Sequence, residues 1–149
     1  MNQYTLSIIA ILGGMFLAAQ AGLNSYLGLL LKNPILASIV AFFSSTIFAF
    51  AFVIFSVTSI PTWIVIKQIP FYLWFTGGLF SVIGIVLYYY TIPKLGISTM
   101  ISLGLFGQLT FSMLAGHYGW LNLPVEPITI RRILGIITMI SGILLINIK

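Results

Sequence analysis

The side chains in this sequence that are able to do chemistry are mostly neutral amides and hydroxyls. Gln20 and Asn24 lie four residues apart, so a helix places both on one face, together with Gly13. Gln108 lies near the middle of a later apolar run. Amides donate and accept hydrogen bonds but supply neither acid–base nor nucleophilic chemistry. These residues therefore predict recognition of a ligand rather than its conversion.

The groups that catalysis needs are nearly absent. The sequence has no aspartate and no cysteine, and its single acidic residue is Glu126. A carboxylate pair, a catalytic triad or a thiolate metal site cannot be assembled from such a set. We therefore expect no enzyme, no metal and no cofactor. The single histidine, His117, is a candidate for proton handling, because histidine changes charge near neutral pH; the alternative is an interfacial histidine without that role.

The composition indicates what surrounds the chain. Of its 149 residues, 60% are hydrophobic and only 5% are charged, whereas a soluble domain carries about a quarter charged residues. The net charge is +5, but the basic residues stand singly or in a pair between apolar runs. A nucleic-acid surface needs a clustered basic stripe. The partner predicted here is the lipid bilayer, with no nucleic acid.

Five stretches are long enough to cross a hydrocarbon core about 30 Å thick, which takes about 20 apolar residues. The predicted helices are 4–22 (or as far as 31), 35–57, 71–92, 97–118 and 133–148. Prolines punctuate the gaps, and the short gap 93–96 predicts an antiparallel hairpin. The runs lack the alternation of a β-barrel. We predict an all-α integral membrane protein forming a single transmembrane domain over 1–149.

The fourth stretch carries a polar sector. Ser98, Ser102, Gln108 and Ser112 fall within roughly a third of the helix circumference. An unpaired amide at mid-membrane depth costs several kcal/mol, so Gln108 is the best single candidate for substrate contact. Serines can instead donate to their own helix backbone. For Gln20 and Asn24 the alternative to a substrate site is a hydrogen bond that joins two helices.

Small and aromatic residues suggest further roles. Tyrosines and tryptophans, Tyr89 among them, gather near the predicted helix ends, which is typical of an interfacial belt. Tyr88 continues a small-residue face and could line a cavity. Small residues allow close approach of membrane helices. Those expected in helix packing or a dimer contact are Gly77, Ser81 and Gly84 on the third stretch and Gly135 and Gly142 on the fifth.

Several short motifs occur in this order along the chain: Gln20-Ala21-Gly22-Leu23-Asn24, Gly77-Gly78-Leu79, Pro93-Lys94-Leu95-Gly96, Gly107-Gln108-Leu109, His117-Tyr118-Gly119 and Arg132-Ile133-Leu134-Gly135. Together they resemble the YdcZ-type family of the drug/metabolite transporter (DMT) superfamily over nearly the whole chain. The resemblance implies half of a ten-helix transporter, working as a homodimer or with a paralogue in a bacterial inner membrane. The sequence departs from the family at Gly116, where an aspartate often precedes the histidine.

With this resemblance, the residues predict a small secondary transporter. Gln20, Asn24, Ser102, Gln108, Ser112 and Tyr88 would contact the substrate. Because the predicted helices carry no negative charge, we expect a neutral, zwitterionic or lipid-like solute rather than a cation. The alternative is a non-transporting membrane subunit that packs with or stabilises a larger partner.

The basic residues also bear on orientation. In a five-helix topology Lys32, Lys94 and Lys149 share one side of the membrane, and Lys67, Arg131 and Arg132 share the other. Orientation follows the excess of Lys and Arg on one side, and here there is none. We therefore expect insertion in both orientations and an antiparallel homodimer. The alternatives are one orientation fixed by Arg131-Arg132, or a paralogue partner of opposite bias.

Overall fold

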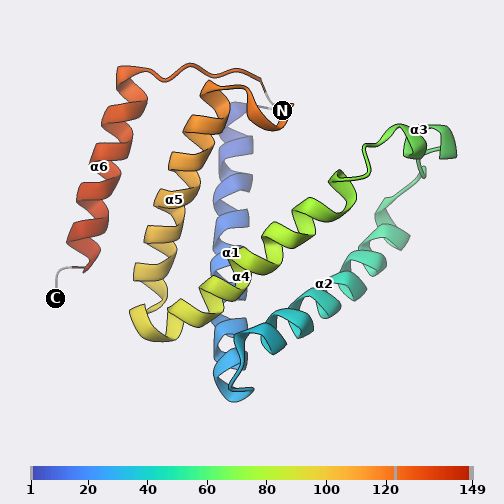
Figure 1. Cartoon of the computed structure of the whole chain (residues 1–149), viewed down its shortest axis with the longest axis horizontal. Coiled ribbons are helices and arrows are strands. Elements are labelled where there is room, and N and C mark those ends of the chain that lie inside the picture. Colours follow the sequence, from blue (N-terminus) through green and yellow to red (C-terminus); the bar gives the residue numbers. More distant parts are fainter. Residues whose placement is uncertain (1, 123, 148–149) are drawn as a thin grey trace. The chain divides into compact units, whose positions relative to one another are not determined.

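The computed structural model describes residues 2–122 and 124–147. Within them the helices are α1 (Gln3–Leu30), α2 (Pro34–Ser56), α3 (Trp63–Gln68), α4 (Leu73–Leu95), α5 (Ile97–His117), the 3-10 helix η1 (Trp120–Asn122) and α6 (Ile130–Asn147) (Figure 1). Helices α1, α2, α4, α5 and α6 are long and apolar enough to span a membrane. The predicted all-α membrane fold with five spanning helices is confirmed. The chain divides into a first unit, 1–94, and a second unit, 95–149.

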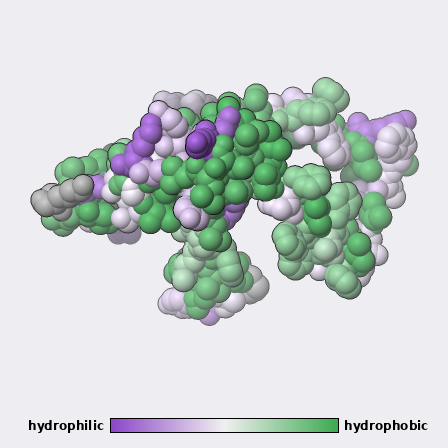
Figure 2. All heavy atoms as spheres, turned by 90° about the horizontal axis from the view of Figure 1, so that it is seen from below, coloured by the Kyte–Doolittle hydropathy of each residue, from purple (hydrophilic) through white to green (hydrophobic). Residues whose placement is uncertain are grey.

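The surface of the helices is apolar. Large side chains such as Phe16, Phe55 and Leu145 are 76%, 87% and 72% exposed, and Figure 2 shows hydrophobic residues over most of the visible helical surface. In water, each Å² of such exposure would cost about 25 cal/mol. Lipid tails remove that cost, so the exposed surface fits a chain whose solvent is the bilayer.

A tight turn joins α1 to α2 in the first unit. The Asn33 side chain caps α2 by accepting hydrogen bonds from the backbone N–H groups of Ile35 (2.8 Å) and Leu36 (3.3 Å). Pro34 occupies the first turn of α2, where its missing N–H is not needed. A Cβ at Gly28 would lie 3.5 Å from both Ala37 Cβ and Pro34 Cα. Position 28 therefore packs directly against the start of α2, and a Cβ there would make ordinary van der Waals contacts.

Some helix boundaries differ from those predicted. α1 continues to Leu30, which confirms the longer of the two ranges predicted for it. The six-residue helix α3 lies in a gap expected to contain none. Its Lys67 ammonium lies 5.6 Å from the centre of the Trp63 ring, one turn earlier. Such a pair suits the membrane interface, where an amphipathic ring and a basic side chain both reach water.

The prediction that the third spanning helix ends before Pro93 is wrong, because α4 continues through Pro93 to Leu95. A proline in the last helical turn removes only the hydrogen bond from its own nitrogen to the carbonyl four residues earlier, that of Tyr89. The backbone turns instead at Gly96, whose φ of +86° suits a residue without Cβ. The antiparallel hairpin across this turn stays a prediction.

The second unit pairs α5 with α6, which run side by side in opposite directions (Figure 1). The connection passes through η1 and returns to α5, where the N–H of Glu126 donates to the Gly116 carbonyl at 2.8 Å. α6 begins at Ile130, three residues earlier than predicted, and is described as far as Asn147. The predicted end at Ile148 lies outside the described residues.

Candidate functional site

The most deeply buried large side chain of the first unit is polar at its tip. Tyr89 on α4 is only 2% exposed. Among the described residues, its hydroxyl has no partner in normal hydrogen-bond geometry. The amides of Asn24 and Gln20 on α1 face this hydroxyl, at a range or angle that does not complete such a bond. We call Gln20, Asn24 and Tyr89 the polar cluster.

The polar cluster is an unusual arrangement in an apolar chain. A buried hydroxyl without a partner costs about 1–3 kcal/mol. Each amide brings one acceptor and two donors, and the hydroxyl can both donate and accept. A water molecule or a polar ligand group placed among them would satisfy several of these at once. The geometry thus fits binding of a neutral hydrogen-bonding group.

The backbone that carries Tyr89 is held from α1. Pro93 has no N–H to donate to the Tyr89 carbonyl, and the Ser25 hydroxyl donates to that carbonyl at 3.4 Å. Ser25 is itself only 2% exposed. On the other side, Tyr89 packs against Ala37 and Ala41 of α2. Ser25 therefore holds α4 where it crosses α1, and the two alanines pack α4 against α2 (Figure 1).

The sequence found part of this cluster. Gln20 and Asn24 do lie together and face another helix, as their spacing predicts. The expectation that Tyr89 belongs to an interfacial belt is wrong, because Tyr89 is buried in the unit. Tyr88, the tyrosine expected at a cavity, is half-buried against the same apolar cluster. One signal was available in the sequence: Pro93 lies four residues after Tyr89 and frees its carbonyl.

The polar residues of α5 do not converge at one point within the second unit. The Ser102 hydroxyl donates to the Thr99 carbonyl at 2.9 Å, so it is satisfied by its own helix. Gln108 is exposed on α5. Ser112 lines a pocket, to which Ser102 and Gln108 do not contribute. Substrate contact by these three residues stays a prediction.

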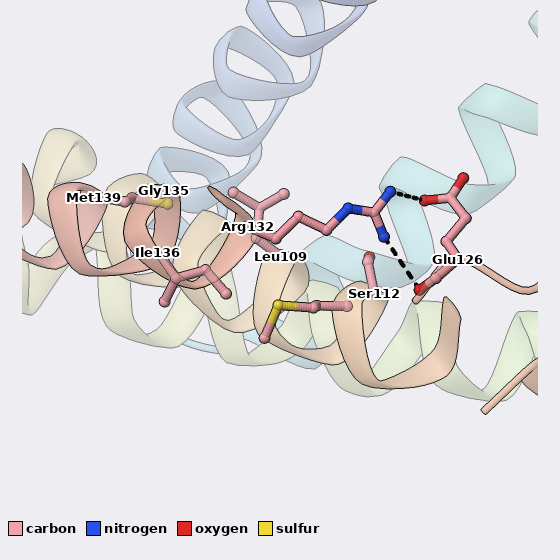
Figure 3. Close-up of a pocket in the computed structure, with 8 residues that line it drawn as sticks. Leu109, Ser112, Glu126, Arg132, Gly135, Ile136 and Met139 are labelled. Carbon is pink, nitrogen blue, oxygen red and sulfur yellow. Dashed lines mark hydrogen bonds and ion pairs between the residues drawn. The ribbon is translucent and has the colours of Figure 1, made fainter. Parts of the chain in front are cut away.

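That pocket lies between α5, α6 and the loop that joins them, and we call it the interhelix pocket. Its volume is about 400 Å³. Glu126 and Arg132 form an ion pair at one end (Figure 3). The Arg132 guanidinium also donates to the carbonyls of Glu126 (3.2 Å) and Pro127 (3.4 Å). The remaining lining residues are Leu109, Ser112, Met113, Gly135, Ile136 and Met139.

His117 ends α5 beside this loop. Its Nδ1 accepts the backbone N–H of Ile128 at 3.4 Å, and its ring meets the edge of Tyr118, with the ring centres 4.9 Å apart. Next to it, a Cβ at Gly116 would lie 3.6 Å from the Glu126 Cβ. In this arrangement His117 holds the loop against the helix. A role in proton handling stays a prediction.

Comparison with known proteins decides the family. The profile of the family described as "putative inner membrane exporter, YdcZ" matches residues 5–145. The chain belongs to this family. No curated protein and no solved structure gives a significant match. As a YdcZ-type protein with five spanning helices, it is a multi-pass protein of the inner membrane, and the description of its family supports a transporter role.

The small-residue faces of this YdcZ-type chain are open. Within the described residues, no neighbouring atom lies within 4 Å of a Cβ built at Gly77, Gly84, Gly135 or Gly142. Close helix approach occurs instead at Gly28, beside Ala37. Gly135 lines the interhelix pocket, whereas the open faces at Gly77, Gly84 and Gly142 leave room for another copy of the chain or a paralogue. A dimer contact there stays a prediction.

Proposed function

We propose that this chain is one protomer of a dimeric secondary transporter that moves a neutral, zwitterionic or lipid-like solute across the inner membrane. The polar cluster contacts that solute. The observation that carries the proposal is the buried Tyr89 hydroxyl, which faces Gln20 and Asn24 without a completed hydrogen bond. A chain whose sole task was packing would gain stability by losing this hydroxyl, whereas a binding site has a use for it.

The charge of the cluster supports the choice of solute. Its members are two amides and a phenol, and the apolar residues packed around Tyr89 are Leu27, Ala37, Ala41 and Ile85. A cation entering such a site would lose its hydration without gaining a counter-charge. A neutral or zwitterionic polar group replaces its water contacts with hydrogen bonds and keeps its net charge of zero.

The dimer is supported by two features. Five spanning helices are half of the ten of larger DMT transporters, and the glycine faces of α4 and α6 are open. Substrates of repeat-built transporters bind near the midplane between two related halves. Two opposed copies would provide such halves, and the balanced distribution of basic residues favours both orientations. Lys149, which enters that balance, lies outside the described residues.

Water access to the polar cluster tests the site without knowledge of the substrate. The chain has no cysteine, so Asn24→Cys and Gln108→Cys would each carry the only thiol. We expect a membrane-impermeant thiol reagent to label both in intact vesicles. The matched control is Leu23→Cys, adjacent on α1 and 72% exposed on the apolar surface, which should resist. If Asn24→Cys resists while a loop thiol at Glu126→Cys reacts, the chain is a packing subunit instead.

Orientation needs a separate experiment. A C-terminal reporter that distinguishes the two sides of the membrane should give signal on both, and one added lysine in a loop should shift it to one side. A one-sided signal that such additions do not move contradicts the antiparallel homodimer. It would leave a paralogue pair as the functional unit.

A further inference from the structure

The interhelix pocket changes character along its length. At one end are the charged side chains of Glu126, in the loop, and Arg132, in the first turn of α6 (Figure 3). Ser112 lies one turn before the end of α5. Leu109 and Met139 lie about two turns into their helices and are apolar. Because both helices span the membrane, the charged end lies at the interface and the apolar end points into the hydrocarbon.

The charged end carries both signs and no net charge. Arg132 uses three of its five N–H donors on Glu126 and Pro127. Its side chain is 41% exposed and that of Glu126 is 59% exposed. Each ion therefore keeps an open face for a group of opposite charge. A ligand with a phosphate and an ammonium would satisfy both, whereas an anion or a cation alone would meet one attraction and one repulsion.

From this geometry we propose that the interhelix pocket binds a zwitterionic phospholipid of the surrounding bilayer. The phosphate lies against Arg132, the ammonium against Glu126, and the first part of one acyl chain against Leu109, Met113, Ile136 and Met139. The pocket's volume of about 400 Å³ is within the range of ligand sites, about 300–1,000 Å³. A lipid in its normal orientation has its headgroup at the interface and its acyl chains in the hydrocarbon. The charged and apolar parts of the pocket lie in the same order. This site is separate from the polar cluster, and the proposal holds whether or not the chain transports a solute.

Native mass spectrometry of the full-length protein tests this. Purified protein is titrated with phosphatidylethanolamine and, separately, with phosphatidylglycerol of the same acyl chains. We expect wild type to retain phosphatidylethanolamine about threefold to fivefold better, the range that partly exposed ion pairs support. Glu126→Gln and Arg132→Gln should each abolish this preference. The matched control Arg131→Gln changes the neighbouring residue, which does not line the pocket, and should keep it.

Further variants separate loss of the site from loss of the fold. Exchanging the two charges, Glu126→Arg with Arg132→Glu, restores a neutral pair and should restore the preference. Ile136→Trp fills the apolar part and should reduce retention of both lipids. Free phosphoethanolamine at millimolar concentration should not displace the lipid, because the acyl chain contributes to binding. Equal retention of the two lipids by wild type, an Arg131→Gln variant that loses the preference, or displacement by the free headgroup would each overturn the proposal.

Discussion

The two units of this chain differ in the charge, burial and pairing of their polar groups. In the first unit Gln20, Asn24 and Tyr89 are uncharged, and the buried tyrosine hydroxyl faces the two amides without a completed hydrogen bond. In the second unit Arg132 and Glu126 are charged, paired with each other and exposed at the end of a pocket. The uncharged tyrosine hydroxyl is therefore the group without a completed hydrogen bond, whereas the two charged groups are paired.

This difference indicates which polar groups are candidates for function in a membrane protein. A charged side chain that reaches the interface finds water or a counter-ion at little cost. A hydroxyl buried between helices can form a hydrogen bond only with groups that the fold or a ligand places beside it. Burial and the missing hydrogen bond are therefore why we propose solute binding in the first unit, and exposed charge is why we propose headgroup contact in the second.

The largest expected effect concerns packing within the units. Gly28→Leu would place a side chain against Ala37 and Pro34, whose atoms already lie 3.5 Å from a Cβ at that position. Overpacking of this kind costs about 1–3 kcal/mol, so the thermal unfolding midpoint in detergent should fall markedly. Gly14→Leu, on the same helix, is the matched control, since no neighbouring described atom lies within 4 Å of a Cβ at that position. Equal losses in the two variants would mean that α1 and α2 are not the closely packed pair.

Tyr89→Phe should separate stability from function. Removing a buried hydroxyl without a partner raises the free energy of unfolding by about 1–2 kcal/mol, while transport of a solute that uses the hydroxyl is lost. Thermal unfolding and uptake into vesicles measure the two effects. Tyr118→Phe, at an exposed tyrosine of the second unit, should change neither. A Tyr89→Phe protein that is less stable would show that the hydroxyl is bonded in the native state.

Ser25→Ala tests the hydrogen bond that holds the backbone of Tyr89 to α1. The mutation removes the donor to the Tyr89 carbonyl, which Pro93 leaves without a helical partner. Interhelical hydrogen bonds in membranes contribute about 0.6 kcal/mol on average and about 1.7 at most. We expect a loss in that range by thermal unfolding. In Ser141→Ala, the lost bond goes to the Ile137 carbonyl of the same helix. That variant should be nearly neutral, and a comparable loss there would argue against a special role for Ser25.

The smallest effect is expected from the ion pair. Glu126→Gln breaks an exposed contact with Arg132, and such pairs contribute about 0–1 kcal/mol. The loss should shrink further in high salt, because salt screens exposed charges. Unfolding midpoints at low and high ionic strength provide the measurement. A loss of several kcal/mol that salt does not reduce would place this pair in a buried environment and remove the contrast between the two units.

The sequence allowed the spanning helices to be predicted, because length and hydropathy alone decide whether a segment crosses a bilayer. It also placed Gln20 and Asn24 on one face, since helical periodicity is local. It did not predict the burial of Tyr89, which depends on how α4 is rotated against α1 and α2. The pairing of Glu126 with Arg132 was equally hidden, because it depends on a loop in which Leu121 and Asn122 adopt positive φ angles. Contacts set by tertiary rotation and loop geometry leave little local signal.

The unequal lengths of the spanning helices have a consequence for the host membrane. α1 has 28 residues and α5 has 21, which at 1.5 Å per residue correspond to about 42 Å and about 32 Å. A hydrocarbon core about 30 Å thick is close to the length of α5 and much too thin for an upright α1. Helix α1 must therefore tilt or emerge at one end. A thicker bilayer relieves the mismatch at α1 and creates one at α5, so the acyl-chain length of the lipids affects the two units in opposite directions.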